Sequence, residues 1–203
     1  MTEPEVDPDL LFESFVRDYR TFGLGRNSNW TRYTTEYMRW FAHEGMSRGF
    51  HVEQEVVYPE PSQLAAQKER KADMVWVTDP DRPLDKDVFF LHLESETEEQ
   101  YVELTLDLLA YSPFKPLPLA VAILHRVTTK SKPEFVGKTL AYAMKRFKSS
   151  TRTLLVMLDL VWNEGDGFLG LIVRGDGSWK QRTARGLLYR WRGAEYFDLK
   201  LEE

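Results

Sequence analysis

Acidic side chains are concentrated in one short stretch of the sequence, FLHLESETEE, at residues 90–99. The stretch begins like a buried β-strand, and on a strand Glu94 and Glu96 share a face with each other and with His92. An acid inside an apolar strand is costly to bury without a partner. Asp73, within KADMVWV on the preceding predicted strand, poses the same problem. These residues are therefore the first candidates for chemistry.

Asp73 and Glu94 on adjacent strands would repel each other and would both lose solvation. Protonation through a raised pKa is one remedy. A divalent cation is the other, and Mg²⁺ prefers carboxylate oxygens with water completing its shell. Such an ion could activate water and stabilise charge on a phosphodiester. A structural ion pair of Asp73 with Arg70 or Lys71 is the alternative.

Other acids have simpler explanations. Glu98 and Glu99 precede a predicted helix, whose N-terminus favours negative charge. Glu44 lies near the middle of an aromatic stripe on the predicted helix 30–49, where a carboxylate requires a cationic partner. Arg48, four residues on, could be that partner. A transition-metal site at His92 is a further alternative, although no second pair of histidines is placed to complete it.

Hydrophobic periodicity predicts helices over 8–22, 30–49, 97–112 and 133–150, and strands over 51–58, 71–77, 88–96, 116–125 and 153–162. Turn-rich sequence then predicts β-hairpins to the end of the chain. Segments 88–96, 97–112 and 116–125 form a crossover unit, so their strands should be parallel. The apolar run of 116–125 suggests a central strand. We expect a single α/β domain over 1–203 with a mixed sheet.

Asp73, a gap of 20 residues, and Glu94-Ser95-Glu96 at a strand end before a helix resemble the PD-(D/E)XK nuclease superfamily. The element order α-β-β-β-α-β resembles its core as well. The resemblance covers residues 30–162 and leaves 163–203 as a C-terminal hairpin extension. Ala72 stands where the family has Pro, and Glu96 stands where Lys is usual. A Glu at that place is similar to a variant found in some type II restriction endonucleases.

The resemblance implies a restriction-endonuclease-like fold and Mg²⁺-dependent hydrolysis of DNA, with Mn²⁺ as a substitute ion. It implies that Asp73 and Glu94 are metal ligands, with the backbone carbonyl of Ser95 assisting. Glu96 would orient the attacking water. Glu44 would support the site from the preceding helix, with Glu36 as the second choice.

Charge distribution favours a polyanionic partner. The net charge is −5, yet residues 126–152 hold eight Lys or Arg and one Glu, and residues 174–192 hold six Lys or Arg and one Asp. Basic regions beside an acidic centre suit DNA held against bound cations. The candidate contacts are Lys138, Lys145 and Lys148 on one predicted helix face and Arg182 and Arg185 in the C-terminal hairpin. A solvated cationic face, or a hairpin that contacts a second copy in a homodimer, is the alternative.

The chain contains no cysteine, which excludes disulfides, zinc–thiolate sites and a cysteine nucleophile. No apolar run approaches the ~20 residues needed to span a bilayer, and the acidic N-terminus does not resemble a signal peptide. We therefore expect a cytoplasmic protein without a membrane partner. Two further hypotheses stand beside the nuclease: an inactive nuclease-like module for nucleic-acid binding or assembly, and a small-molecule metalloenzyme that uses His92.

Overall fold

The computed structural model describes residues 6–19, 21, 30–57, 71–78, 89–112, 114, 117–127, 132–160, 167–192 and 194–202. Its helices are α1 (Pro8–Asp18), α2 (Trp30–Ser47), α3 (Val102–Ala110), preceded by a 3₁₀ turn η1 (Glu99–Tyr101), and α4 (Lys132–Phe147). Its strands are β1 (His51–Val57), β2 (Lys71–Val77), β3 (Phe89–Glu96), β4 (Leu119–Val127), β5 (Thr153–Leu160), β6 (Gly167–Val173), β7 (Trp179–Trp191) and β8 (Ala194–Leu201).

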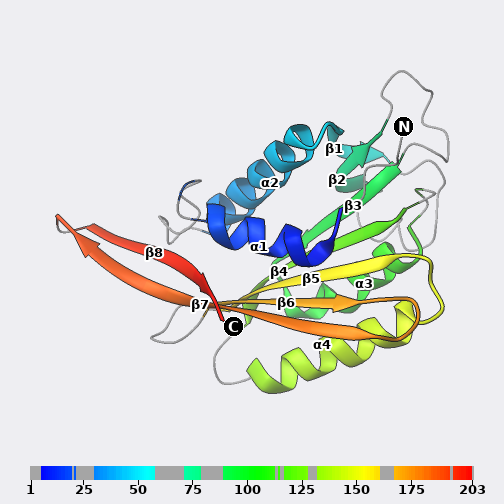
Figure 1. The fold of residues 1–203 in the computed structure, drawn as a ribbon. Coiled ribbons are helices and arrows are strands. Elements are labelled where there is room, and N and C mark those ends of the chain that lie inside the picture. Colours follow the sequence, from blue (N-terminus) through cyan, green and yellow to red (C-terminus); the bar gives the residue numbers. More distant parts are fainter. Residues whose placement is uncertain are drawn as a thin grey trace.

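The described strands form one eight-stranded sheet in which the order in space follows the order in sequence. The β3–β4 and β4–β5 pairs are parallel, and the other neighbouring pairs are antiparallel. The predicted α/β architecture with a mixed sheet is therefore confirmed, as is the parallel crossover through α3. β4 lies inside the sheet, as its apolar sequence predicted. The strands after residue 163 continue this sheet, and the β7–β8 hairpin extends beyond its body (Figure 1).

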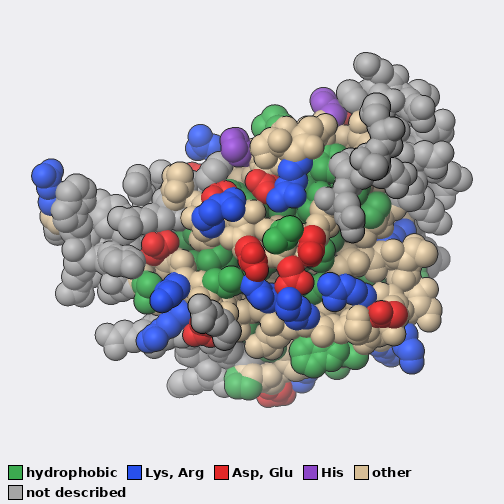
Figure 2. Space-filling view, in the orientation of Figure 1, with side chains coloured by type: hydrophobic (Ala, Val, Ile, Leu, Met, Phe, Trp, Pro, Cys, Tyr) green, Lys and Arg blue, Asp and Glu red, His purple; other side chains and the backbone are tan. Residues whose placement is uncertain are grey.

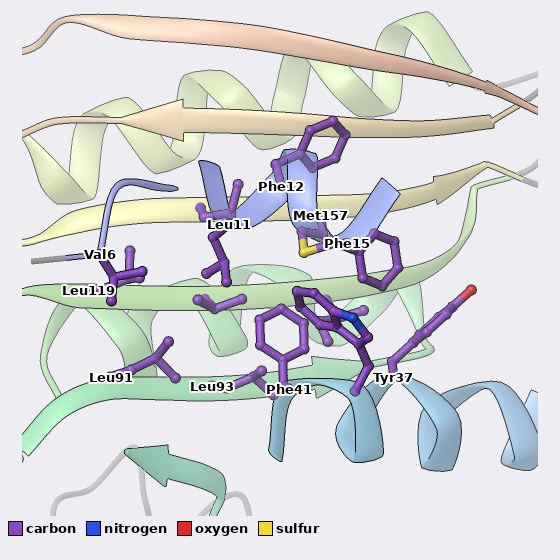
Figure 3. Packing of buried hydrophobic residues seen from close by; sticks show 14 of the residues in the cluster. Val6, Leu11, Phe12, Phe15, Tyr37, Phe41, Leu91, Leu93, Leu119 and Met157 are labelled. Carbon is purple, nitrogen blue, oxygen red and sulfur yellow. The ribbon is translucent and has the colours of Figure 1, made fainter. Parts of the chain in front are cut away.

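Helices cover both faces of the sheet. α1 and α2 lie on one face, and α3 and α4 lie on the other (Figure 1). On the α1–α2 face, aromatic side chains of the helices meet aliphatic residues of β3, β4 and β5; the labelled ones include Phe15, Tyr37, Phe41, Leu93 and Met157 (Figure 3). Burial of these large side chains is the main force that holds the two helices on the sheet.

Local signals set the helix ends. The side chain of Asp7 caps α1 by accepting a 2.8 Å hydrogen bond from the amide of Asp9. Gly49, with φ of 87°, follows α2, and the amide of Phe50 returns to the carbonyl of Gly45. The α-helix expected from residue 97 starts later in the structure. The 3₁₀ turn η1 occupies 99–101, and α3 begins after it.

Candidate active site at the ends of β2 and β3

An open cleft of about 1580 Å³ lies between α2 and the strand ends that carry the predicted acids. Its lining combines the exposed flank of α2, the edge strand β1 and the β3–η1 junction. The lining residues are Thr34, Thr35, Met38, Arg39, Ala42, His43, Met46, Gln54, Glu55, Asp73 and residues 95–100. Five of them are acids, so the cleft suits a cation or a ligand that is bound through one.

Asp73 is fixed at the point where the β2–β3 ladder ends. The last registered pair is Met74 with Leu93, so the next positions along the two strands are Asp73 and Glu94. There the carboxylate Oδ2 of Asp73 accepts a 2.6 Å hydrogen bond from the backbone amide of Ser95. The side chain thus satisfies an amide on the neighbouring strand and remains at the wall of the cleft. Asp73 thus contacts the backbone amide of Ser95, whereas the expected metal ligand of Ser95 is its carbonyl.

The alternative partners proposed for Asp73 are its neighbours in sequence. Lys71 lies with its Nζ 3.8 Å from Glu55 Oε2 on β1. Arg70 falls outside the described residues. Glu55 itself has a positive φ of 55° at the place where the β1–β2 pairing skips the Glu55 and Asp73 positions. The pairing of β1 with β2 is therefore irregular at the backbone position of Asp73.

Glu94 is completely buried and does not line the cleft. Its Oε1 lies 2.8 Å from Nε2 of His92, which is also completely buried. The predicted shared face of His92 and Glu94 is therefore a direct contact. Nδ1 of the same ring lies 2.9 Å from Oγ of Ser112, a residue that the sequence reasoning did not identify. Glu94 thus lies one layer behind the cleft wall.

Glu96 lines the cleft while its Oε1 accepts hydrogen bonds from the amides of Thr97 (2.8 Å) and Glu98 (2.9 Å). The carboxylate therefore holds the turn that leads from β3 into η1. Glu98 and Glu99 lie at the start of η1 and are exposed, in agreement with the prediction that a helix start explains them. Of the acids in FLHLESETEE, Glu94 and Glu96 are buried, whereas Glu98 and Glu99 are exposed.

Glu44 does not join Asp73. It is buried on the aromatic side of α2, and its Oε1 accepts hydrogen bonds from Nε (2.9 Å) and Nη2 (2.6 Å) of Arg48. The required cationic partner is thus Arg48, which was the structural alternative. The second choice, Glu36, lies 3.8 Å from Arg39. His43, which was overlooked, lines the cleft from α2 instead, one residue away from Glu44.

The predicted basic residues divide between two surroundings. Lys138 and Lys145 are exposed on α4, Lys148 is exposed directly after it, and Arg185 is exposed on β7. Lys138 is 2.7 Å from Glu134, which raises the pKa of the lysine, and Glu99 at the cleft contributes to the same shift. Tyr142, also on α4, is half-buried and donates a 3.0 Å hydrogen bond to Asp107.

Arg182 belongs to an ion-pair network with α1. Its Nη2 donates to Glu13, while Lys180 lies 2.7 Å from Asp9. Figure 2 shows acidic and basic side chains gathered against one another in the middle of this face. Arg182 and Arg185 are three residues apart on β7, so they lie on opposite faces of the sheet. The five predicted DNA contacts therefore do not form one surface.

The residues at the cleft fit a hard divalent cation by donor type. The carboxylates of Asp73 and Glu96 and the backbone carbonyl of Ser95 are the oxygen donors that Mg²⁺ and Mn²⁺ accept. Among the described residues, no group of three or more His, Asp or Glu side chains is arranged to hold a metal ion. An ion at this place would therefore rely on few protein ligands and on water, as Mg²⁺ commonly does.

Comparison of the chain with protein-family models, with curated proteins and with solved structures finds no match. Function is therefore inferred from the geometry of the site. In the part of the chain that the structure describes, none of the helices combines the length and apolar character that a membrane span requires.

Proposed function

We propose that this protein is a Mg²⁺-dependent phosphodiesterase that cleaves DNA at the cleft beside β2 and β3, with Mn²⁺ as an alternative ion. The observation that carries the proposal is the hydrogen bond from the Ser95 amide to Asp73. This bond holds Asp73 of β2 against the end of β3, the strand that also carries Glu94 and Glu96. The proposal thus rests on the contact between two separate segments of the chain.

The sheet order supports a restriction-endonuclease-like architecture. An antiparallel β1–β2–β3 meander is followed by α3 and by β4, which is parallel to β3. This arrangement agrees with the α-β-β-β-α-β core of the superfamily that the sequence resembles. It positions Asp73 and Glu94 at neighbouring places on adjacent strands, which the proposed chemistry requires.

Each residue then has a role that follows from its position. Asp73 and the carbonyl of Ser95 would bind the ion from the cleft wall, and Glu94 would support it from the buried side. Glu96, held by two amides, would orient the attacking water. The bound ion would supply Lewis-acid stabilisation of the phosphate charge and lower the pKa of a coordinated water. Glu44 has no part in this scheme, because Arg48 engages it.

The proposed substrate surface is the exposed side of α4 together with the turn that follows it. Lys138, Lys145 and Lys148 could contact successive phosphates without reading base identity. Glu99, which lines the cleft, influences the pKa of Lys138, so the basic helix begins near the acidic site. A phosphate chain along α4 would therefore lead toward the cleft.

The decisive experiment compares Asp73→Asn with Glu134→Gln, a control that removes an exposed carboxylate on α4. Supercoiled and linear DNA are incubated with each full-length variant in Mg²⁺, in Mn²⁺ and in EDTA. We expect cleavage by the wild type and by Glu134→Gln, and a loss of at least about 100-fold for Asp73→Asn at unchanged thermal stability. Undiminished cleavage by Asp73→Asn would refute the assignment.

One observation favours a second candidate, a nuclease-like module that binds nucleic acid without hydrolysis. Glu94 is wholly buried against His92, and the described residues hold no three-membered metal cluster. This candidate predicts DNA binding without detectable Mg²⁺ or Mn²⁺ binding. Titration calorimetry with each ion, together with a DNA mobility-shift assay, separates the two functions.

A further inference from the structure

A chain of buried hydrogen bonds runs from the end of α3 to Glu94. The amide of Phe114 donates to Oγ of Ser112 at 3.3 Å, Ser112 Oγ lies 2.9 Å from His92 Nδ1, and His92 Nε2 lies 2.8 Å from Glu94 Oε1. Ser112, His92 and Glu94 are completely buried. These hydrogen-bonded side chains are therefore inaccessible to a substrate. They can influence the cleft only through Glu94.

The imidazole of His92 bridges Ser112 and Glu94. A backbone amide can only donate, so Ser112 Oγ accepts from Phe114. Ser112 Oγ and the Glu94 carboxylate each contact a different ring nitrogen of His92, and which nitrogen donates depends on the tautomer. Both ring nitrogens therefore have a polar partner in the core.

The hydrogen-bonded series is held in place at Ser112, at the end away from Glu94. The carbonyl of Ser112 accepts a 3.0 Å hydrogen bond from Nη2 of the buried Arg152, which directly precedes β5. The ring of Phe114 meets the His92 ring edge-on, with centroids 5.2 Å apart. The imidazole is thus held from the side opposite Glu94. It can hold one oxygen of that carboxylate in a defined direction.

We infer that His92, held by Ser112, is the positioning residue that orients Glu94 toward a divalent cation bound at Asp73. This inference rests on the proposed function. It identifies the side chain that would hold Glu94, the buried ligand of the proposed ion. A side chain that is hydrogen-bonded to a metal ligand fixes the direction of that ligand, and the loss of such a partner typically costs about 10–100-fold in metal affinity. Stability alone is a weak reason for a buried polar chain, because well-packed apolar residues often do as well.

The test measures Mn²⁺ binding to the full chain by titration calorimetry, with thermal unfolding recorded without the ion. His92→Phe keeps the ring against Phe114 but removes both nitrogens, and we expect Kd to rise about 10–100-fold. His92→Gln restores a hydrogen-bonding amide near the Nε2 position, and its Kd should return to within about 3-fold of the wild type. Ser112→Ala keeps the imidazole but removes its anchor, and should give an intermediate loss.

Tyr37→Phe serves as the matched control, because it removes a buried 2.8 Å hydrogen bond on the opposite face of the sheet. It should lower thermal stability and leave the Mn²⁺ affinity unchanged. If His92→Phe fails to fold, Ser112→Ala carries the test. If His92→Phe and Ser112→Ala fold and bind Mn²⁺ with wild-type affinity, while Asp73→Asn does not bind the ion, the role of His92 is refuted. The proposed metal site would then still stand. A wild type that binds no Mn²⁺ would remove the proposed metal function together with this inference.

Discussion

The hydroxyl of Tyr37 on α2 donates a 2.8 Å hydrogen bond to the carboxylate of Asp159 on β5, and both residues are buried. This bond links the second helix to the centre of the sheet, 122 residues later in the chain. Burial, followed by the charge of Asp159, raises the pKa of Tyr37 well above its usual value of 10.0. The folded protein therefore keeps this phenol protonated at a pH where an unfolded chain would ionise it.

Tyr37→Phe should lower the free energy of unfolding at pH 8 by about 1–3 kcal/mol, because Asp159 loses a buried donor. It should also reduce the alkaline loss of stability. The stabilisation is complete below the unfolded pKa near 10.0 and is lost as the pH rises through the folded value. Urea unfolding at pH 8 and at several values above 10 measures both effects. Tyr101→Phe, at an exposed position, is the control and should leave the pH dependence unchanged.

Arg152→Met should destabilise the protein by about 1.5–3 kcal/mol, because three carbonyls at the end of α3 lose a charged donor. The guanidinium donates to the carbonyls of Leu109 (3.1 Å), Ala110 (2.6 Å) and Ser112 (3.0 Å). Burial lowers the pKa of Arg152, which reflects the cost of placing the charge there. Denaturant unfolding measures the loss. Arg185→Met, at an exposed site, should change the midpoint little, and equal effects of the two changes would contradict the assigned role.

Two helical glycines should respond oppositely to alanine. A Cβ at Gly45 on α2 would lie 2.7 Å from the Trp76 indole and 2.8 Å from Val52, so Gly45→Ala should destabilise by about 1–3 kcal/mol. A Cβ at Gly137 on α4 meets nothing within 4 Å, so Gly137→Ala should stabilise by about 0.5–1 kcal/mol. Thermal unfolding of the two variants compares the same change, glycine to alanine, in two different packing environments. The same sign of change in both would argue against the packing of α2 described here.

The proposed DNA surface predicts different behaviour for Lys145 and Arg182. Lys145→Ala should weaken DNA binding and reduce the slope of log K against log salt by about 0.9, as expected for one lost phosphate contact. Arg182→Met should instead lower thermal stability, because Arg182 binds Glu13 of α1, and should leave that slope unchanged. Fluorescence anisotropy at several salt concentrations measures the slope. An equal loss of slope for both variants would show that Arg182 also faces DNA.

Periodicity predicted most of the fold because each strand and helix carries its pattern within its own residues. The crossover from 88–96 to 116–125 followed from chirality and connection length, and β3 and β4 are parallel as expected. Alternation also gave the shared face of His92 and Glu94. The pairing of Glu44 with Arg48 was accessible too, since it depends on spacing along one helix.

Contacts across long sequence separations were not accessible. No local pattern around Arg182 indicates that it pairs with Glu13, which lies 169 residues earlier. In the same way, no local pattern indicates that Ser112 is the partner of His92. A strand pattern assigns a residue to a face but does not say which polar group it meets there. For that reason the burial of Glu94 behind the cleft wall, in contact with His92, could not be predicted. His43 was missed because the same helix offered an acid at the next position.

The attachment of α1 has a consequence for the order of folding during synthesis. Phe12 lies against Gly170 of β6, and Glu13 and Asp9 bind residues of β7. These strands belong to the last fifth of the chain. Part of the surface on which α1 docks is therefore synthesised long after α1 itself, since Arg182 follows Glu13 by 169 residues. Until then, α1 can pack only against elements made earlier, such as α2, where Phe15 meets Tyr37 and Trp40 edge-on.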